Sequence, residues 1–312
     1  MRKTEILHKP VLLKETIKLL NVKKDGIYVD GTAGFGGHSR AILDRLENGR
    51  LIMIDQDPDA VAYLKKNFKS NLVSVIKGNF SEVKSLLKSV GVSLVDGVLL
   101  DVGVSSFQIE NFERGFSYHD PSAPLDMRMS KEGKSAEDVI NNYKEEELLK
   151  VIWKYSQERF SKRIAREIVK RRKVSPITTA GELVDVIKSA VPAKFLRKSS
   201  IHPARRTFQA IRIEVNGELS ALDKGLTEAF DSLKVNGRLA VITFHSLEDK
   251  IVKKRMVEWC RGCICPADFP ICVCKHSPVG KLITKRAIVA SLEELAQNSR
   301  GRSARLRAVC SV

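Results

Sequence analysis

The sequence predicts an α/β protein built on a doubly wound, mostly parallel sheet, with an all-helical domain inserted after the fourth strand. Three observations support this fold class. Short apolar runs alternate with helical patterns over residues 26–101, as in parallel strands joined by helices. The first run ends in a glycine-rich turn, where such a sheet offers backbone amides to a ligand. From residue 135 to about 230 the periodicity is helical, and a further apolar run follows at 238–244.

Composition and charge limit the class of protein. The 312 residues can form one large domain or two, and 43% hydrophobic with 29% charged residues is typical of a globular protein. No apolar run approaches the ~20 residues of a membrane span, and the basic start lacks the apolar region of a signal peptide, so we expect a cytoplasmic location. The net charge of +17 favours a polyanionic partner, with nucleic acid ahead of an anionic membrane.

The glycine-rich turn narrows the choice of ligand. Residues 26–29 form the first strand, Asp30 ends it, and glycines follow at 31, 34, 36 and 37 before a helix from Ser39. A dinucleotide fingerprint counted from Gly34 would need a third glycine where Ser39 stands. A phosphate-binding Walker loop would need lysine where His38 stands. An acid before the first glycine fits S-adenosylmethionine better, because this cofactor carries an ammonium group and no pyrophosphate.

The next three strands add residues at the same edge of the sheet. Residues 50–54 end on Asp55, residues 72–76 lead to Phe80, and residues 95–100 end on Asp101. We interpret Asp55 as a ligand of ribose hydroxyls, with a solvated turn acid as the alternative. Phe80 either stacks on an adenine or packs in the core. Strands one and four are neighbours in this topology, so Asp30 and Asp101 should flank one site.

Helices are expected between and after these strands. A short helix is expected over residues 8–20. Asp57 and Pro58 predict the start of a helix that reaches about residue 68, and Ser81 predicts the cap of one that ends at Gly91. Further helical segments are expected at 145–155, 158–172 and 179–191, after one opened by a capping box of Ser135 and Asp138.

The sequence divides into two predicted domains. Residues 1–107 with 206–312 form the sheet domain, and residues 108–205 form the helical insertion. A long helix from residue 206 to about 233 leads back to the sheet, with a turn at Asn236 and Gly237. The strand at 238–244 then brings His245 to the carboxyl edge. Residues 281–289 and 304–309 are expected to close the sheet.

Much of the positive charge lies in or near the insertion. Residues 155–215 hold 15 Lys/Arg against 5 Asp/Glu, which gives +10 of the total +17. A charge run is usually a solvated helix face, but one sign beside a ligand site favours contacts with phosphates. A second arginine-rich segment, Ser299 to Arg307, is a further candidate for such contacts.

Five of the six cysteines lie close together near the end of the chain. They read Cys-x2-Cys-x-Cys-x6-Cys-x-Cys at positions 260, 263, 265, 272 and 274, with Cys310 beyond them. No cysteine precedes residue 260, so the main fold has no disulfide framework. Four thiolates could bind zinc tetrahedrally, but the C-x-C pairs are tighter than the usual C-x2-C knuckle. We assign no metal to them, and the question stays open.

The residues near the strand ends indicate which atom of a nucleic-acid base could receive a methyl group. Methylation at carbon 5 of a pyrimidine needs a cysteine thiolate, and no cysteine follows a parallel strand. An exocyclic amine is a poor nucleophile that benefits from acceptors for its protons. Asp101 stands where DNA amino-methyltransferases place an Asp/Asn/Ser-Pro-Pro-aromatic tetrad, but Val102-Gly103-Val104 has neither proline. These observations lead to an S-adenosylmethionine-dependent transferase that acts on nucleic acid.

A set of long motifs resembles one family. The motifs lie at residues 8–13, 30–39, 55–58, 101–106, 114–117, 124–129, 205–210, 244–249 and 298–307. With them the chain resembles, nearly end to end, bacterial 16S ribosomal RNA (cytosine-N4) methyltransferases of the MraW type. The resemblance implies a Rossmann-like methyltransferase sheet with an inserted helical domain, N4-methylation of one decoding-region cytidine of 16S ribosomal RNA, and the small ribosomal subunit as partner.

The resemblance also implies roles for individual residues. The cofactor-binding positions are Gly36, Gly37, His38, Asp55, Phe80, Asp101 and Gln108. As a hypothesis for catalysis, Asp101 is shared between the cofactor and the substrate amine, with Ser105, Ser106 or His245 as further acceptors. Asp126 and Arg128 are weaker candidates for the target pocket. Two other classes stay open: a nicotinamide dehydrogenase, which the missing third glycine disfavours, and a non-catalytic RNA-binding or assembly factor.

Overall fold

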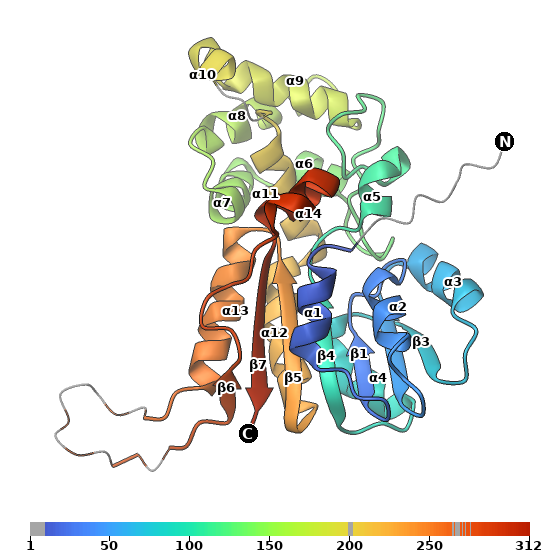
Figure 1. The fold of residues 1–312 in the computed structure, drawn as a ribbon. Coiled ribbons are helices and arrows are strands. Elements are labelled where there is room, and N and C mark those ends of the chain that lie inside the picture. Colours follow the sequence, from blue (N-terminus) through green and yellow to red (C-terminus); the bar gives the residue numbers. More distant parts are fainter. Residues whose placement is uncertain are drawn as a thin grey trace. The chain divides into compact units, whose positions relative to one another are not determined.

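A computed structural model describes residues 10–198, 202–263, 265, 269, 271, 273–274 and 276–312. The chain forms two compact units (Figure 1). The sheet unit comprises the chain up to Gly103 and again from Leu219 to Val312, and the helical unit comprises Val104–Glu218. Among the described residues, no helix is both long enough and apolar enough to cross a membrane.

The sheet unit is built on one seven-stranded sheet of order β3-β2-β1-β4-β5-β7-β6. The parallel strands are β1 (Ile27–Asp30), β2 (Arg50–Asp55), β3 (Val73–Lys77), β4 (Val95–Asp101) and β5 (Leu233–Thr243). Two antiparallel strands complete it, β6 (Gly280–Leu282) and β7 (Arg305–Ser311). The strand order reverses between β1 and β4, which is where ligands bind in open α/β sheets. The predicted fold class is confirmed.

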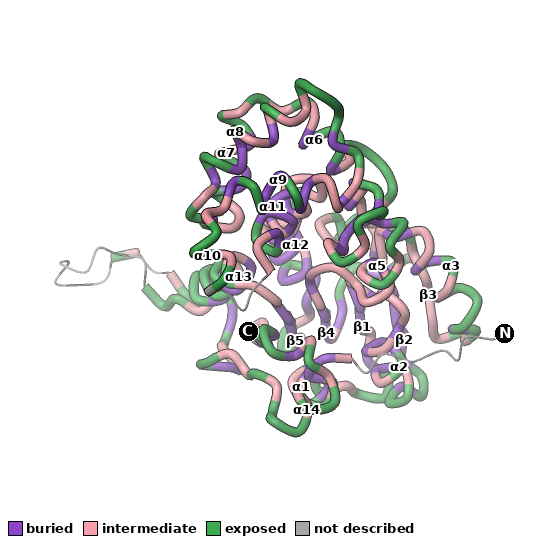
Figure 2. Tube along the Cα trace, turned by 90° about the horizontal axis from the view of Figure 1, so that it is seen from above, coloured by how far each residue is buried: buried purple, intermediate pink, exposed green. Residues whose placement is uncertain are grey.

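Two apolar layers explain why the strands are continuous hydrophobic runs. Ile52 and Leu100 belong to one core, which includes side chains from α4 (Val83–Ser89), α12 (Glu218–Asp231) and α13 (Ser246–Trp259). Leu51 and Leu99, their neighbours in sequence, belong to the other, together with α1 (Leu13–Leu20), α2 (Gly37–Leu43) and α3 (Pro58–Asn67). Strand side chains alternate between faces, so a sheet covered on both sides needs apolar residues at every position (Figure 2).

The helical unit has a hydrophobic core of its own. Its helices are α5 (Ser106–Glu110), α6 (Ala136–Asn142), α7 (Glu145–Ser156), α8 (Ser161–Arg172), α9 (Ala180–Ala190), α10 (Ala193–Lys198) and α11 (Arg205–Asn216). The unit extends beyond the predicted range of 108–205 at both ends. At the carboxyl end the reason is α11, which places Phe208, Ala210 and Ile211 in the core of this unit.

Several local predictions need correction. The long helix expected over 206–233 is two helices, because Gly217 takes a left-handed conformation (φ 56°) after α11. Asn79, not Ser81, caps the helix after β3, since its side chain accepts the Ser81 N–H at 2.9 Å. The expected turn at Asn236 is a bulge inside β5, and the strand expected at 281–289 is shorter. The helix expected from residue 8 is α1, and His8 lies outside the described residues.

The other capping predictions are confirmed. The Asp57 side chain accepts the Asp59 N–H at 3.0 Å, and Pro58 is the first residue of α3. Ser135 and Asp138 form the predicted capping box of α6, and Gly91 is left-handed (φ 71°) after α4.

Candidate functional site at the ends of the parallel strands

The turn between β1 and α2 is shaped by three glycines that serve different purposes. Gly36 has φ 80°, and a Cβ there would lie 2.3 Å from Cζ of Phe68. A Cβ on Gly37 would lie 2.5 Å from Cγ of Pro10. Both positions therefore need glycine because the protein itself packs against them. Gly34 (φ 52°) differs, since nothing comes nearer to its Cβ position than the Thr32 carbonyl at 4.0 Å. A ligand has room to approach the backbone at Gly34.

Two carboxylates fasten this turn to the ends of the strands. Asp30 is 1% exposed and accepts the Ser39 hydroxyl at 2.6 Å and the Thr32 N–H at 3.3 Å. Asp55, at the end of β2, accepts the N–H groups of Gly34 at 2.7 Å and Asp57 at 2.8 Å. Its carboxylate holds the loop directly, in addition to the ribose role predicted for it.

Burial governs the pKa values of these two acids. Desolvation raises the pKa of Asp30, against the opposing hydrogen bond from Ser39 and the nearby His38. Desolvation also raises the pKa of Asp55 to about 6, against its two backbone hydrogen bonds.

Asp101 and His38 bring unpartnered polar atoms to the same place. Asp101 donates its N–H to Oγ1 of Thr32 at 2.6 Å, and its Oδ2 lies 3.5 Å from Nε2 of His38. His38 is 6% exposed, yet neither ring nitrogen has a hydrogen-bond partner among the described residues. The buried Oδ1 of Asp101 likewise has none. Leaving such groups unpaired is costly, so the arrangement fits a polar ligand that supplies both a donor and an acceptor.

Phe80 packs against its own unit. The ring packs directly against Gly225 of α12, so closely that a Cβ on this glycine would lie 2.4 Å from Cδ2 of Phe80. The ring also contacts the core on that face of the sheet. The packing interpretation accounts for these contacts. Stacking on an adenine stays a prediction for the exposed part of this half-buried ring.

His245 lies at the end of β5, as predicted, where it caps α13. Its Nδ1 accepts the Glu248 N–H at 3.4 Å, and its Nε2 lies 3.0 Å from Oε1 of Glu248. Glu248 is 2% exposed and also accepts the N–H groups of Phe244 and His245. Nδ1 therefore caps α13, whereas Nε2 is a buried atom without a hydrogen-bond partner among the described residues.

Ser105 and Gln108 belong to the helical unit, where they form a capping box. The Ser105 hydroxyl accepts the Gln108 N–H at 3.2 Å, and Oε1 of Gln108 accepts the Ser105 N–H at 2.9 Å. This exchange defines the start of α5. Asp126 and Arg128 form a bidentate ion pair with each other in the same unit, with a shortest N–O distance of 2.6 Å.

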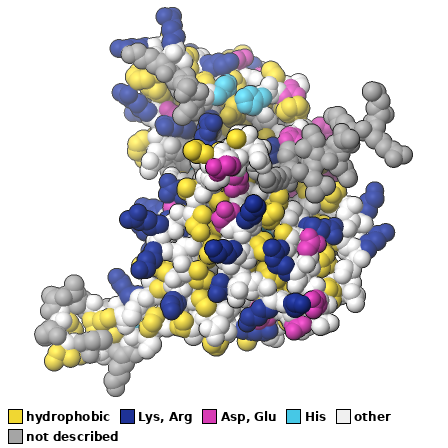
Figure 3. All heavy atoms as spheres, viewed as in Figure 1, with side chains coloured by type: hydrophobic (Ala, Val, Ile, Leu, Met, Phe, Trp, Pro, Cys, Tyr) yellow, Lys and Arg dark blue, Asp and Glu magenta, His cyan; other side chains and the backbone are white. Residues whose placement is uncertain are grey.

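The positive charge of the helical unit is exposed along one face of α8. Its apolar positions, among them Ile164 and Ile168, lie in the core of the unit. The opposite face and the residue just before the helix carry exposed cations at Arg159, Lys162, Arg163, Arg166 and Lys170. The spacing of three and four residues aligns them, and we call them the α8 basic face. Figure 3 shows further Lys and Arg side chains across the surface.

Part of the predicted phosphate-binding charge is used inside the protein. Arg172 donates to the carbonyls of Ile140 and Tyr143, both at 2.6 Å. Arg307 is paired with Asp249 through two hydrogen bonds of 2.7 and 3.1 Å and is only 11% exposed. The prediction that Arg307 faces phosphate is therefore wrong for this residue, which supports β7 and α13 instead.

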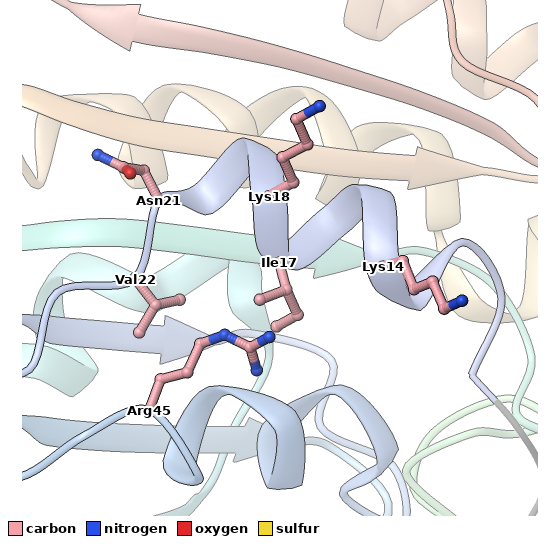
Figure 4. A pocket seen from close by; sticks show the side chains of 6 residues that line it. All are labelled: Lys14, Ile17, Lys18, Asn21, Val22 and Arg45. Atoms are coloured by element: carbon pink, nitrogen blue, oxygen red, sulfur yellow. The ribbon is translucent and has the colours of Figure 1, made fainter.

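A surface depression beside α1 lies away from these residues (Figure 4). It is lined by Lys14, Ile17, Lys18, Asn21, Val22 and Arg45. Arg45 follows α2, which leads back to the edge of the sheet where the strands begin. None of the predicted site residues lines it.

Thr32 and Ser39 are the site residues that the sequence reasoning missed. Each donates to Asp30, and Thr32 also joins the turn to Asp101. In the sequence, Thr32 lies two residues and Ser39 nine residues after Asp30, the acid at the end of the strand. Hydroxyl residues at such spacings are too common to indicate a role in a site.

Comparisons with known proteins identify the family of this chain. The MraW methylase family matches residues 5–312. The ribosomal RNA small subunit methyltransferase H of Clostridium botulinum (strain 657 / Type Ba4) is 52% identical over 309 residues, covering 98% of this chain and 99% of that protein. Its namesake from Brevibacillus brevis is 50% identical over 304 residues, covering 96% of each. An rRNA methylase structure from Streptococcus thermophilus covers 98% of this chain and 99% of that one, at 9% identity and a TM-score of 0.43. The chain belongs to the MraW methylase family.

Proposed function

We propose that this protein is an S-adenosylmethionine-dependent ribosomal RNA methyltransferase that methylates the N4 amine of one cytidine in the decoding region of 16S ribosomal RNA. Membership of the MraW methylase family supports the reaction class, as do relatives named small subunit methyltransferase H. The observation that carries the proposal is the buried pair His38 and Asp101, whose unpartnered polar atoms lie beside the glycine turn.

The donor groups fit S-adenosylmethionine. Asp101 Oδ1 can accept a hydrogen bond from the ammonium group of the cofactor, and His38 can donate one to its carboxylate. The open backbone at Gly34 gives the methionine part access to the loop, while Gly36 and Gly37 keep the turn closed against Phe68 and Pro10. Asp55 lies at the next strand end, where ribose hydroxyls are bound in nucleotide-binding sheets. When bound, the cofactor supplies an electrophilic methyl group on a sulfonium.

Asp101 is our principal candidate for catalysis. The lone pair of an exocyclic amine is delocalised into the base, so an acceptor on its N–H helps the nitrogen to attack and to lose a proton. The Asp101 carboxylate, shared between the cofactor and the amine, supplies such an acceptor. His245 acts as a positioning residue in this proposal, because its Nδ1 caps α13 and its Nε2 lies 3.0 Å from the Glu248 carboxylate. The acceptor role of Ser105 and the cofactor contact of Gln108 stay predictions from the resemblance.

The α8 basic face is proposed to hold the RNA backbone. Its cations carry one sign and are exposed, as phosphate contacts require. Such contacts position an RNA without reading its sequence, so choice of the cytidine has to come from other residues.

Methylation of defined RNA tests the proposal. Small ribosomal subunits and free 16S RNA from a strain lacking this gene are incubated with the protein and labelled S-adenosylmethionine, and nucleosides are identified by mass spectrometry. We expect 4-methylcytidine at one decoding-region position. Asp101→Asn should slow single-turnover transfer about a hundredfold or more. Label at carbon 5, on ribose, or nowhere would contradict the proposal.

Asp96→Asn is the matched control. Asp96 lies on the same strand near its opposite end, where its carboxylate accepts the Ile27 N–H at 2.9 Å and pairs with Lys234 at 2.7 Å, so Asp96→Asn makes the same chemical change away from the proposed site. We expect its transfer rate to stay within about twofold of the wild type. An equal loss in both variants would mean that the Asp101 effect is structural.

A further inference from the structure

The segment between α13 and β6, residues 260–279, contains a cluster of thiols. The Sγ atoms of Cys263, Cys265 and Cys274 all lie within 4.8 Å of one another. Cys260, at the end of α13, is half-buried against the sheet core and is not part of this group. Cys272 lies outside the described residues. We call residues 260–279 the cysteine loop (Figure 1).

The distances within the cluster fit a single metal ion. Sulfur atoms bonded at about 2.3 Å to a tetrahedral zinc ion are separated by ~3.8 Å. The Sγ atoms of Cys263 and Cys274 lie 3.8 Å apart. A disulfide would need about 2.05 Å, and a cluster of several irons would need its cysteines farther apart than one ion does. The spacing is that of one edge of a zinc tetrahedron.

The backbone also supports bound thiolate. Val273 donates its N–H to Sγ of Cys265 at 3.4 Å. A backbone N–H that points at a ligating sulfur stabilises the negative charge and fixes the orientation of the ligand. The hydrogen bond links residues eight apart in sequence, so it also brings the two cysteine-containing parts of the loop together.

The described residues of the cysteine loop make few other contacts that could hold its shape. None of its described residues from 261 to 279 belongs to a hydrophobic core. Phe269, Ile271 and Val273 are instead 50%, 75% and 65% exposed, and Figure 3 shows apolar side chains gathered in this loop. A hydrogen bond from Val279 N–H to the Trp259 carbonyl (2.9 Å) closes its base. Because the described residues from 261 to 279 contribute neither a helix nor core contacts, a crosslink is the means of ordering them that the thiols offer.

We propose that Cys263, Cys265 and Cys274 bind one Zn²⁺ and that this ion folds the cysteine loop. On binding, the three thiols lose their protons and form three zinc–sulfur bonds, and the remaining position is filled by a further ligand. The site is structural, because its ligands lie at the end of α13 away from the strand-end residues of the proposed methyl transfer. The sequence left this question open because C-x-C spacing alone is ambiguous, whereas the sulfur positions are not.

Metal analysis of the full-length protein tests this proposal. We expect about one zinc per chain by plasma mass spectrometry after purification without chelator. Replacing Cys263, Cys265 or Cys274 by serine should reduce zinc at least about tenfold. Cys310→Ser is the matched control: this thiol lies on β7, donates to the Ser311 carbonyl and should leave zinc unchanged. Cobalt substitution should give the absorption of tetrahedral thiolate coordination, and titration in C272S should show whether that residue supplies a fourth thiolate.

A second readout separates loop folding from global folding. Removal of zinc with a chelator should increase chymotrypsin cleavage at Phe269 by about tenfold or more, while circular dichroism of the rest of the chain stays unchanged. Added zinc should restore protection in the wild type but not in Cys265→Ser. Less than about 0.1 zinc per chain with no uptake of added zinc or cobalt would overturn the proposal. So would bound iron, or a Cys263–Cys274 disulfide that persists in protein purified under reducing conditions. No outcome depends on methylation, so this test is independent of the proposed function.

Discussion

The glycine turn after β1 and the cysteine loop after α13 solve the same problem in opposite ways. Both are irregular segments that must keep a fixed shape. The glycine turn is fastened by Asp30 and Asp55, which the strands place beneath it, and Phe68 packs against it. Beyond Cys260, the described residues of the cysteine loop have neither a buried carboxylate nor core contacts. A loop that binds its ligand reversibly has to be rigid without it, whereas a loop with a permanent ion can depend on that ion.

The largest expected effect is on the fastening of the glycine turn. Asp30→Ala leaves the Ser39 hydroxyl and the Thr32 N–H unpaired in a buried site, so we expect it to lower the free energy of unfolding of the sheet unit by about 3 kcal/mol. The unit can be followed through Trp259, which stacks on Phe230 at 4.1 Å, in a Trp153→Phe background that removes the second tryptophan of the chain. Urea unfolding by fluorescence gives the value.

Asp25→Ala is the control for this measurement. Asp25 lies just before β1 and is exposed, with only an exposed contact from Asn48. A change within about 0.5 kcal/mol is expected for it. An equally small change in Asp30→Ala would show that the buried carboxylate does not hold the turn.

The same substitution in the two loops gives the second test. In Gly36→Ala the new Cβ meets the Phe68 ring at 2.3 Å, and the backbone is left-handed (φ 80°), so we expect a loss of about 2 kcal/mol. In Gly262→Ala nothing lies within 4 Å of the new Cβ, and the change should stay within about 0.5 kcal/mol. Equal effects measured by urea unfolding would refute the contrast between a packed and an unpacked loop.

The site residues differ in whether their positions and roles could be predicted from the sequence. The strand ends Asp30, Asp55 and Asp101 were predictable because apolar runs, glycines and topology place them at one edge. The Thr32 and Ser39 hydroxyls were not, since their role depends on side-chain directions that periodicity does not encode. His245 was placed correctly at the end of β5, but its capping of α13 depends on the position of Glu248. Likewise, the pairing of Arg307 with Asp249 arises from a tertiary contact, whereas the break after α11 follows from the local left-handed backbone of Gly217.

Titration of Asp55 should have a smaller effect, which lowers the free energy of unfolding as the pH rises. Burial raises its pKa in the folded protein to about 6, above the ordinary value of 3.8, so the folded state holds its proton to higher pH than the unfolded chain does. This contribution to stability is complete below the ordinary pKa and is lost as the pH rises through about 6. Between about pH 5 and about pH 7.5 we expect the wild type to lose about 1 kcal/mol relative to Asp55→Asn, measured by urea unfolding. A difference that grows in the opposite direction would mean that the Gly34 and Asp57 hydrogen bonds outweigh burial.

The smallest expected effect is that of zinc removal on global stability. A ligand stabilises a fold only in so far as it binds the folded state better than the unfolded one. The proposed ligands Cys263, Cys265 and Cys274 lie close together in sequence, so a knuckle made from them can persist when the sheet unit unfolds. Its binding energy then cancels, and chelation should change the free energy of unfolding, followed through Trp259, by less than about 0.5 kcal/mol. The Cys265→Ser variant should match the chelated wild type. A loss of several kcal/mol would show that the ion couples the cysteine loop to the core and that the two loops differ less than their contacts indicate.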